Sequence, residues 1–177
     1  ADIAGMFIMQ NPEQYKKQVT THTQVDSSQV YLLDSIVDGK KNLSKQILQV
    51  VTTILNNDIN SSIAILARYR YLLEQVKQEL KEALPSSNSV TIKYWTFHGS
   101  KGLEADYCIL VGFFQGRTGS PNLNKEDAVV EALLPSLDSF PHSEERRLLY
   151  VALTRAKKKS YLIADSMAPS VFINELL

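Results

Sequence analysis

Apolar residues along the chain fall into segments whose spacing alternates between that of helices and that of strands. Residues 3–15 have a helical pattern that is interrupted at Pro12, and residues 29–34 alternate as a half-buried strand does. In residues 42–55 the apolar positions recur at intervals of three and four, which predicts a helix with one buried face. Residues 63–67 are uniformly apolar, as expected of a strand that is covered on both faces.

The same alternation continues to the end of the chain. Further helices are predicted at residues 72–84, 143–156 and 169–177, and further strands at residues 90–95, 106–112 and 160–164. Residues 85–89 are predicted to form a turn, and residues 115–125 a loop that is the best candidate for a mobile segment. Helices and strands in this order indicate an α/β domain with a mainly parallel sheet.

Length and charge restrict the possible functions. The 177 residues, 44% of them hydrophobic, are enough for one compact domain with a single core. The 19 basic and 19 acidic residues cancel, so no overall positive field draws the chain to nucleic acid. Any contact with DNA must therefore be local.

The sequence carries no sign of export or membrane insertion. No apolar run approaches the roughly 20 residues that span a bilayer, and no basic region precedes the apolar residues at the amino terminus. The one cysteine, Cys108, lies in an apolar run and excludes a disulfide within the chain. We therefore expect a cytoplasmic protein with no membrane partner. The chain begins without methionine, which suggests a piece of a longer protein.

The first segment with candidate chemistry is residues 96–104, Thr-Phe-His-Gly-Ser-Lys-Gly-Leu-Glu, between two predicted strands. In an open α/β sheet, loops beyond the carboxyl ends of strands form the ligand crevice, and glycines let backbone N–H groups approach phosphates. Taken alone, the segment fits an ordinary connecting loop equally well.

The second segment is residues 144–156, in which Arg155 falls near the end of a predicted amphipathic helix. An arginine held there can be aimed across an interface to stabilise a phosphoryl group in transfer. The simpler interpretation is a cation that complements the helix dipole, and we assign Lys157, Lys158 and Lys159 to that role.

Together the two segments resemble motifs V and VI of the superfamily 1 DNA helicases of the UvrD/Rep type. The pattern Thr-x-His-x-x-Lys-Gly-Leu-Glu is followed by an apolar strand and then by Glu-Glu-Arg-Arg-Leu-x-Tyr-Val-x-x-Thr-Arg-Ala. Residues 65–69, 104–107 and 131–135, with similar segments at both ends, resemble the helicase IV branch of bacterial members. The resemblance implies a RecA-like, three-layer domain that is the second, C-terminal motor domain, over residues 1–177.

The resemblance also implies a nucleotide-facing site. Arg155 corresponds to the arginine that reaches the ATP γ-phosphate, and such fingers are worth about three to five powers of ten in rate. Glu104 corresponds to the glutamate that approaches the nucleotide sugar. Gly102 gives the backbone room beside it, and Lys101 is included as a further nucleotide contact.

Three other residues correspond to positions that contact single-stranded DNA in the family. Thr96 and His98 resemble residues that touch the strand's backbone, and Arg68 lies in a preceding motif that also meets DNA. Contacts of this kind position a strand without reading its sequence.

The chain departs from a complete motor in one respect. Residues 39–41 lack the preceding glycine and the hydroxyl of a phosphate-binding loop, and no acidic magnesium-binding motif is evident. ATP and Mg²⁺ are therefore expected to be held mainly by an N-terminal RecA-like domain, and this fragment alone is expected to be inactive. Arg68 and Thr96 are also too close in sequence for the accessory domain that UvrD and Rep carry between these positions.

The resemblance implies an ATP-dependent 3′–5′ DNA helicase or translocase that acts in DNA repair, with single-stranded DNA, the N-terminal motor domain and repair proteins as partners. The alternative is a remodelling factor that binds RNA polymerase with the same motor fold. A third possibility is a degenerate binding module, against which the presence of both Glu104 and Arg155 argues.

Overall fold

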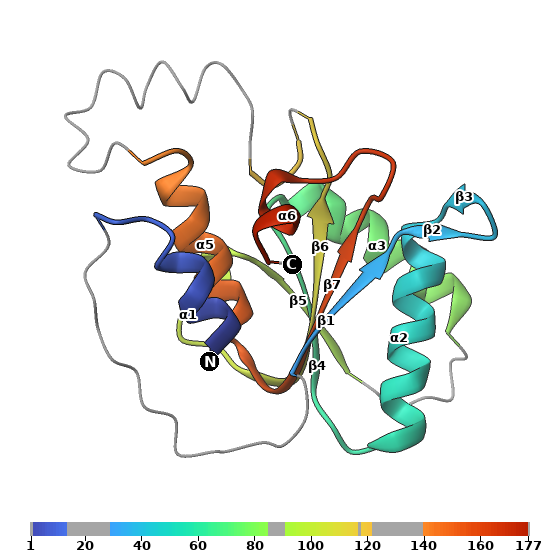
Figure 1. Ribbon diagram of the computed structural model, residues 1–177. Coiled ribbons are helices and arrows are strands. Elements are labelled where there is room, and N and C mark those ends of the chain that lie inside the picture. The colour runs from blue at the N-terminus through green and yellow to red at the C-terminus, as the bar shows by residue number, and fades with distance from the viewer. Residues whose placement is uncertain (1, 14–28, 85–90, 117, 122–139, 177) are drawn as a thin grey trace.

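The computed structural model describes residues 2–13, 29–84, 91–116, 118–121 and 140–176 (Figure 1). Its centre is a five-stranded sheet in the order β1-β7-β6-β4-β5, and every neighbouring pair is parallel. The strands are β1 (Val30–Asp34), β4 (Ile63–Ala67), β5 (Ile92–Thr96), β6 (Ala105–Phe113) and β7 (Ala156–Ala164). The α/β class and the parallel sheet are thus confirmed, and the arrangement is that of a RecA-like domain.

Helices cover both faces of this sheet, which gives three layers (Figure 1). On one face lie α1 (Asp2–Ile8), α5 (Ser143–Leu153), α6 (Val171–Leu176) and the short 3₁₀ helix η1 (His98–Ser100). On the other lie α2 (Leu43–Asn57) and α3 (Arg70–Ala83). Within the described residues, no helix has both the length and the hydrophobicity needed to cross a membrane.

The central strands are apolar at every position because both of their faces are buried. Along β4, Ala64 and Leu66 pack under α5, whereas Ile63 and Ile65 pack under α2 and α3. All five residues of β4 are fully buried, and burial of an aliphatic side chain contributes about 1.5–3 kcal/mol. The sheet is therefore a rigid base for the loops at its two edges.

The carboxyl-terminal part of the fold corrects one predicted boundary. The helix predicted over residues 143–156 ends at Leu153, and the strand predicted over residues 160–164 begins earlier, at Ala156. Lys157, Lys158 and Lys159 therefore lie in β7 and not in the last turn of a helix. Their assignment as helix-dipole cations was wrong, because β7 must start level with β6, where Ala105 pairs with Ala156.

A small hairpin was not predicted. β2 (Ile36–Val37) and β3 (Lys40–Lys41) pair antiparallel across Asp38 and Gly39, both of which have positive φ angles, 53° and 73°. Asp-Gly is a strong signal for a two-residue turn of this type. Of the predicted mobile loop 115–125, Gly119, Ser120 and Pro121 are buried, whereas Gln115 and Thr118 are exposed. Residues 117 and 122–125 of this loop and the predicted turn 85–89 lie outside the described residues.

Candidate functional site

The loop from β5 to β6 carries most of the candidate site residues. It starts at the carboxyl end of β5, passes through η1 and ends at the amino end of β6. The loop therefore connects the two sides of the sheet at which the parallel strands end and begin, which we call the carboxyl edge and the amino edge. Phe97 and Ser100 are fully buried and anchor the loop, with the Ser100 hydroxyl donating to the Phe97 carbonyl over 2.7 Å. The residues between and after these anchors, His98, Gly99 and residues 101–104, are exposed.

At the carboxyl edge, Thr96 shapes the start of this loop. Its Oγ1 accepts a hydrogen bond from the Gly99 N–H over 3.0 Å, which connects the end of β5 to η1. A Cβ at position 99 would lie 3.0 Å from the same oxygen, so the turn favours glycine there. Thr96 Oγ1 is the acceptor in this bond, and within the described residues its hydroxyl hydrogen has no partner; His98 follows two positions later and is exposed.

Arg68 follows β4 and reaches the same edge. The Phe97 N–H donates to the Ala67 carbonyl over 2.9 Å, which continues the β4–β5 pairing and places Arg68 next to Thr96. Arg68 is mostly buried, and its Nε donates to Oε1 of Glu145 on α5 over 2.7 Å, with the two side chains 20% and 11% exposed. The structure thus collects Thr96, His98 and Arg68 at one edge of the sheet.

Glu145 was not recognised from the sequence as a partner of Arg68. The two residues are 77 positions apart, and they meet because α5 covers the face of the sheet on which Ala64 and Leu66 of β4 are buried. Among the described residues, Oε2 of Glu145 is buried without a hydrogen-bond partner, and Oε1 accepts from Arg68. The Nη groups of Arg68 have no acceptor in the same part of the chain.

At the amino edge, Arg155 lies between the end of α5 and the start of β7. Its Nε donates to the Val151 carbonyl over 2.8 Å, Nη2 to Thr154 Oγ1 over 3.0 Å and Nη1 to the Leu103 carbonyl over 3.4 Å. These acceptors are neutral. Within the described part of the chain Arg155 forms no ion pair, whereas Arg68, Arg146 and Arg147 each pair with a glutamate.

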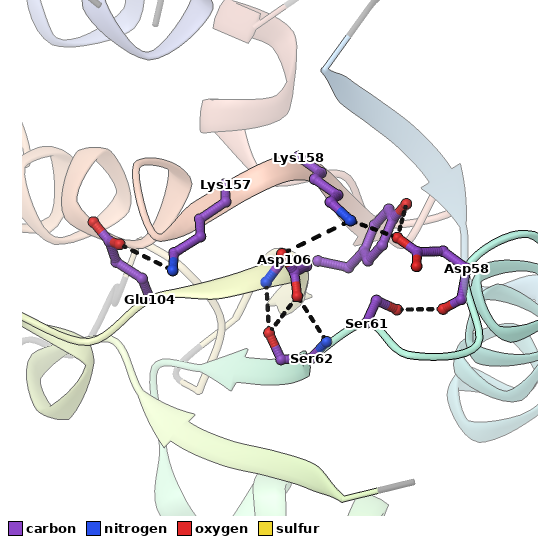
Figure 2. Close-up of polar contacts among 8 residues, drawn as sticks. Asp58, Ser61, Ser62, Glu104, Asp106, Lys157 and Lys158 are labelled. Atoms are coloured by element: carbon purple, nitrogen blue, oxygen red, sulfur yellow. Dashed lines mark hydrogen bonds and ion pairs between the residues drawn. The ribbon is translucent and has the colours of Figure 1, made fainter. Parts of the chain in front are cut away.

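Glu104 lies beside Arg155 because β6 and β7 begin together. The Ala105 N–H donates to the Arg155 carbonyl over 3.2 Å, and Lys157 Nζ approaches a carboxylate oxygen of Glu104 to 3.7 Å (Figure 2). Gly102 adopts φ +80° and has open space where a Cβ would point, so conformation and not crowding requires glycine there. Lys101 is exposed at the end of η1 and is not drawn into this group by any described contact.

A second polar cluster fixes the starts of β6 and β7, which directly follow Glu104 and Arg155. Lys158 Nζ lies 2.6 Å from Asp58 and 3.9 Å from Asp106, and both a backbone N–H and the hydroxyl of Ser62 donate to Asp106 (Figure 2). These donors from Ser62, with Lys158 nearby, hold the pKa of Asp106 below its usual range. Because Asp106 is in β6 and Lys158 in β7, the cluster ties both strands to the segment that precedes β4.

The single cysteine has no part in this chemistry. Cys108 is fully buried in β6, and burial raises the pKa of its thiol to about 12 although Arg155 is near. The thiol is therefore protonated at neutral pH and is not a nucleophile. The interpretation of Cys108 as a small core residue is confirmed.

Comparisons with known proteins show which family the chain resembles. Residues 72–167 match the family model described as UvrD-like helicase C-terminal domain. The chain is 36% identical to DNA helicase IV of Escherichia coli (strain K12) over 180 residues, which cover 99% of the chain and 24% of that protein. It is also 33% identical over 108 residues to the exonuclease/helicase subunit RexA of Lactococcus lactis subsp. cremoris (strain MG1363), covering 41% of the chain and 9% of that protein.

A solved structure has the same fold. The C-terminal domain of a possible DNA helicase from Lactobacillus plantarum WCFS1 superposes with a TM-score of 0.58 at 16% sequence identity, covering all of this chain and 92% of that one. The chain spans about a quarter of the length of the Escherichia coli DNA helicase IV, although nearly the whole of the chain is matched.

Proposed function

The chain belongs to the UvrD-like helicase C-terminal domain family, and from this we propose that it is the second RecA-like motor domain of an ATP-dependent DNA helicase. In the whole protein, an N-terminal RecA-like domain would hold ATP and Mg²⁺. This chain would close on that domain from the side of Glu104 and Arg155. The 3′–5′ direction and a task in DNA repair follow from the family resemblance.

The observation that carries this proposal is the uncompensated charge of Arg155. Its guanidinium is held by three neutral acceptors, so its orientation is fixed while its positive charge is not neutralised by a carboxylate of the described residues. A guanidinium carries five N–H donors, and at least one on each Nη group remains for an external anion. Those properties are what a cationic group needs to stabilise a γ-phosphoryl group in transfer.

The neighbours of Arg155 are suited to the rest of a nucleotide. Glu104 is exposed at the same edge and offers acceptors for sugar hydroxyls, while Lys157 offsets its charge. Gly102, two positions before Glu104, leaves open space in the loop, and the exposed Lys101 adds a positive charge there. We infer that this edge of the sheet faces the nucleotide.

The opposite edge is proposed as part of the track for single-stranded DNA. Thr96, His98 and the Nη groups of Arg68 offer hydrogen-bond donors to backbone phosphates, which fix the position of a strand without reading its bases. The loop of residues 97–104 joins the two edges. Its buried anchors, Phe97 and Ser100, would transmit a displacement at Glu104 to Thr96, so nucleotide turnover and strand movement would be coupled through one short segment.

The finger assignment is tested by Arg155→Ala in the full-length protein, with ATP turnover measured in the presence of single-stranded DNA. We expect turnover to fall by about three to five powers of ten, because the charge that develops in the transition state loses its partner. Affinity for single-stranded DNA should change less than about threefold, since Arg155 lies at the other edge from Thr96.

Arg155→Lys is the matched control, because it keeps the charge but removes the fixed donor fork. We expect it to recover no more than a small part of the lost rate. Turnover by Arg155→Ala within a few-fold of the unaltered protein would show that the finger assignment is wrong.

A further inference from the structure

Two tyrosines extend the carboxyl edge beyond Arg68. The rings of Tyr69 and Tyr71 are stacked, with centroids 5.8 Å apart and planes at 25°. Side chains two apart within a helix do not face each other, but Tyr69 precedes α3 with an extended backbone, so its ring can reach Tyr71 in the first turn. Tyr71 is 52% exposed, which is unusual for a large aromatic side chain in a well-packed domain.

This pair is held in place from the core outward. Glu145 on α5 binds Arg68, and the Arg68 guanidinium lies over the Tyr69 ring at 5.2 Å. Tyr69 in turn stacks on Tyr71. The exposed ring is therefore the last member of a series of contacts that begins at a nearly buried ion pair. A preorganised aromatic surface loses little conformational entropy when a ligand stacks on it.

The protein contains another tyrosine pair that has an obvious structural role. Tyr31 and Tyr161 are register partners on β1 and β7, and their rings stack at 5.3 Å as a cross-strand contact of the sheet. Tyr69 and Tyr71 belong to no such strand pair. Among the described residues, the buried side of α3 is formed by Leu72, Leu73, Val76 and Leu80, and the exposed Tyr71 is not one of them.

We propose that Tyr69 and Tyr71 form a stacking platform for the bases of single-stranded DNA. The inference rests on the proposed function, since it places the platform beside the backbone contacts of Thr96 and His98. Aromatic faces accept any base, as a motor that moves along every sequence requires. Arg68 and Arg70 flank Tyr69, and the first turn of α3 contains no acidic residue, so the surroundings favour a polyanion over an acidic protein surface.

The test compares two oligonucleotides of equal length and charge, oligo(dT) and an abasic oligomer, for binding to the full-length protein by fluorescence anisotropy. Tyr71→Ala should weaken binding of oligo(dT) by roughly 5- to 100-fold, the range for loss of one base–aromatic stack. Binding of the abasic oligomer should change less than about twofold, and Tyr71→Phe should bind both as the unaltered protein does. Ile59→Ala is the control, because Ile59 is 72% exposed at the opposite edge.

Two outcomes would overturn the platform. Equal weakening for both oligomers would mean that Tyr71 supports the fold or a protein contact, and no weakening for either would mean that no base stacks there. His98→Ala, measured alongside, separates this proposal from the function on which it rests. His98→Ala should weaken the binding of both oligomers to the same extent and reduce the salt dependence of binding. If Tyr71→Ala weakens binding of oligo(dT) only, while His98→Ala leaves binding of both oligomers unchanged and Arg155→Ala leaves ATP turnover unchanged, the platform stands and the proposed motor function fails.

Discussion

At the scale of single residues, Gly102 shows why the loop between β5 and β6 needs a glycine. Its φ of +80° is a conformation that residues with a Cβ rarely adopt, although nothing lies within 4 Å of the position that a Cβ would take. Gly102→Ala should therefore lower the free energy of unfolding by about 1–2 kcal/mol through backbone strain alone. The change is measurable as a lower urea midpoint of the chain.

Gly5→Ala provides the comparison for this prediction. Gly5 lies within α1 and also has open space around it, but its φ is not in the left-handed region. Alanine is favoured over glycine in a helix by up to about 1 kcal/mol, so this variant should be more stable. Equal effects of the two substitutions would contradict the role given to the backbone of Gly102.

Asp106 should make the stability of the chain depend on acid pH. Hydrogen bonds from Ser62 lower the pKa of the folded carboxyl below the unfolded value. The folded state therefore stabilises the charged carboxylate more than the unfolded state does. This contribution to the free energy of unfolding is present above about pH 4 and is lost as pH falls through the folded pKa.

Asp106→Asn should lower the free energy of unfolding by about 1 kcal/mol at pH 7, the scale of hydrogen bonds to a charged group that is partly exposed. The deficit relative to the unaltered chain should shrink as pH falls from 7 to below about 4, as urea titrations at several pH values would show. Ser62→Ala should reproduce the deficit. A deficit that is constant over this range would rule out Asp106 as its source.

Sequence motifs predicted Thr96, His98, Glu104 and Arg155 as site residues, because each lies at a fixed position of a local pattern. The roles of these residues stay predictions. The pairing of Arg68 with Glu145 could not be predicted, because it depends on the path of α5 across the sheet and not on spacing. The stacking of Tyr69 on Tyr71 depends likewise on the exact residue at which α3 begins.

At the scale of elements, a buried arginine holds three helices together. Arg146 on α5 is 4% exposed, and its two Nη groups bind the carboxylate of Glu175 on α6. Its Nε donates to the Pro141 carbonyl over 3.0 Å. The guanidinium also lies 4.8–5.3 Å from the centroids of three aromatic rings, those of Phe7, Phe140 and Phe172. Since Phe7 belongs to α1, this side chain connects α1, α5 and α6.

Arg146→Ala should therefore destabilise the chain by about 3 kcal/mol, because it leaves Glu175 without its partner and opens space between aromatic rings. Arg147→Ala is a matched control on the same helix. Arg147 is 44% exposed and pairs with Glu144 at 3.4 Å, so its loss should cost less than about 0.5 kcal/mol. Thermal unfolding of both variants measures the difference, and similar midpoints would contradict the connecting role of Arg146.

Elements were predictable wherever burial imposes a period on the sequence. The five strands of the sheet and the helices α2 and α3 follow from alternation or from intervals of three and four. The end of α5 was predicted three residues too late, because Thr154, Arg155 and Ala156 are compatible with a helix and only the pairing of β7 with β6 stops it. The hairpin of β2 and β3 was missed because strands of two residues have no period to detect.

At the scale of the whole molecule, the separation of the two candidate sites could not be predicted from the sequence. The order β1-β7-β6-β4-β5 places the starts of β6 and β7 together and the ends of β4 and β5 together, at opposite edges of the sheet. Glu104 and Arg155 therefore meet although they are far apart in sequence, while Thr96 lies at the other edge although it is eight positions from Glu104. Topology, and not spacing, divides the motif into two sites.

This division leads to a prediction for the chain in isolation. In the proposed function Arg155 would supply charge to a phosphate, but no phosphate-binding loop is found in the sequence, so the nucleotide would have contacts on one side only. The purified chain should show no ATP turnover above background and should bind single-stranded DNA only weakly at physiological salt. The full-length protein, assayed in parallel, should show both activities. ATP turnover by the isolated chain that disappears in Arg155→Ala would contradict the assignment of nucleotide binding to an N-terminal domain, since the chain would then hold ATP with its own residues.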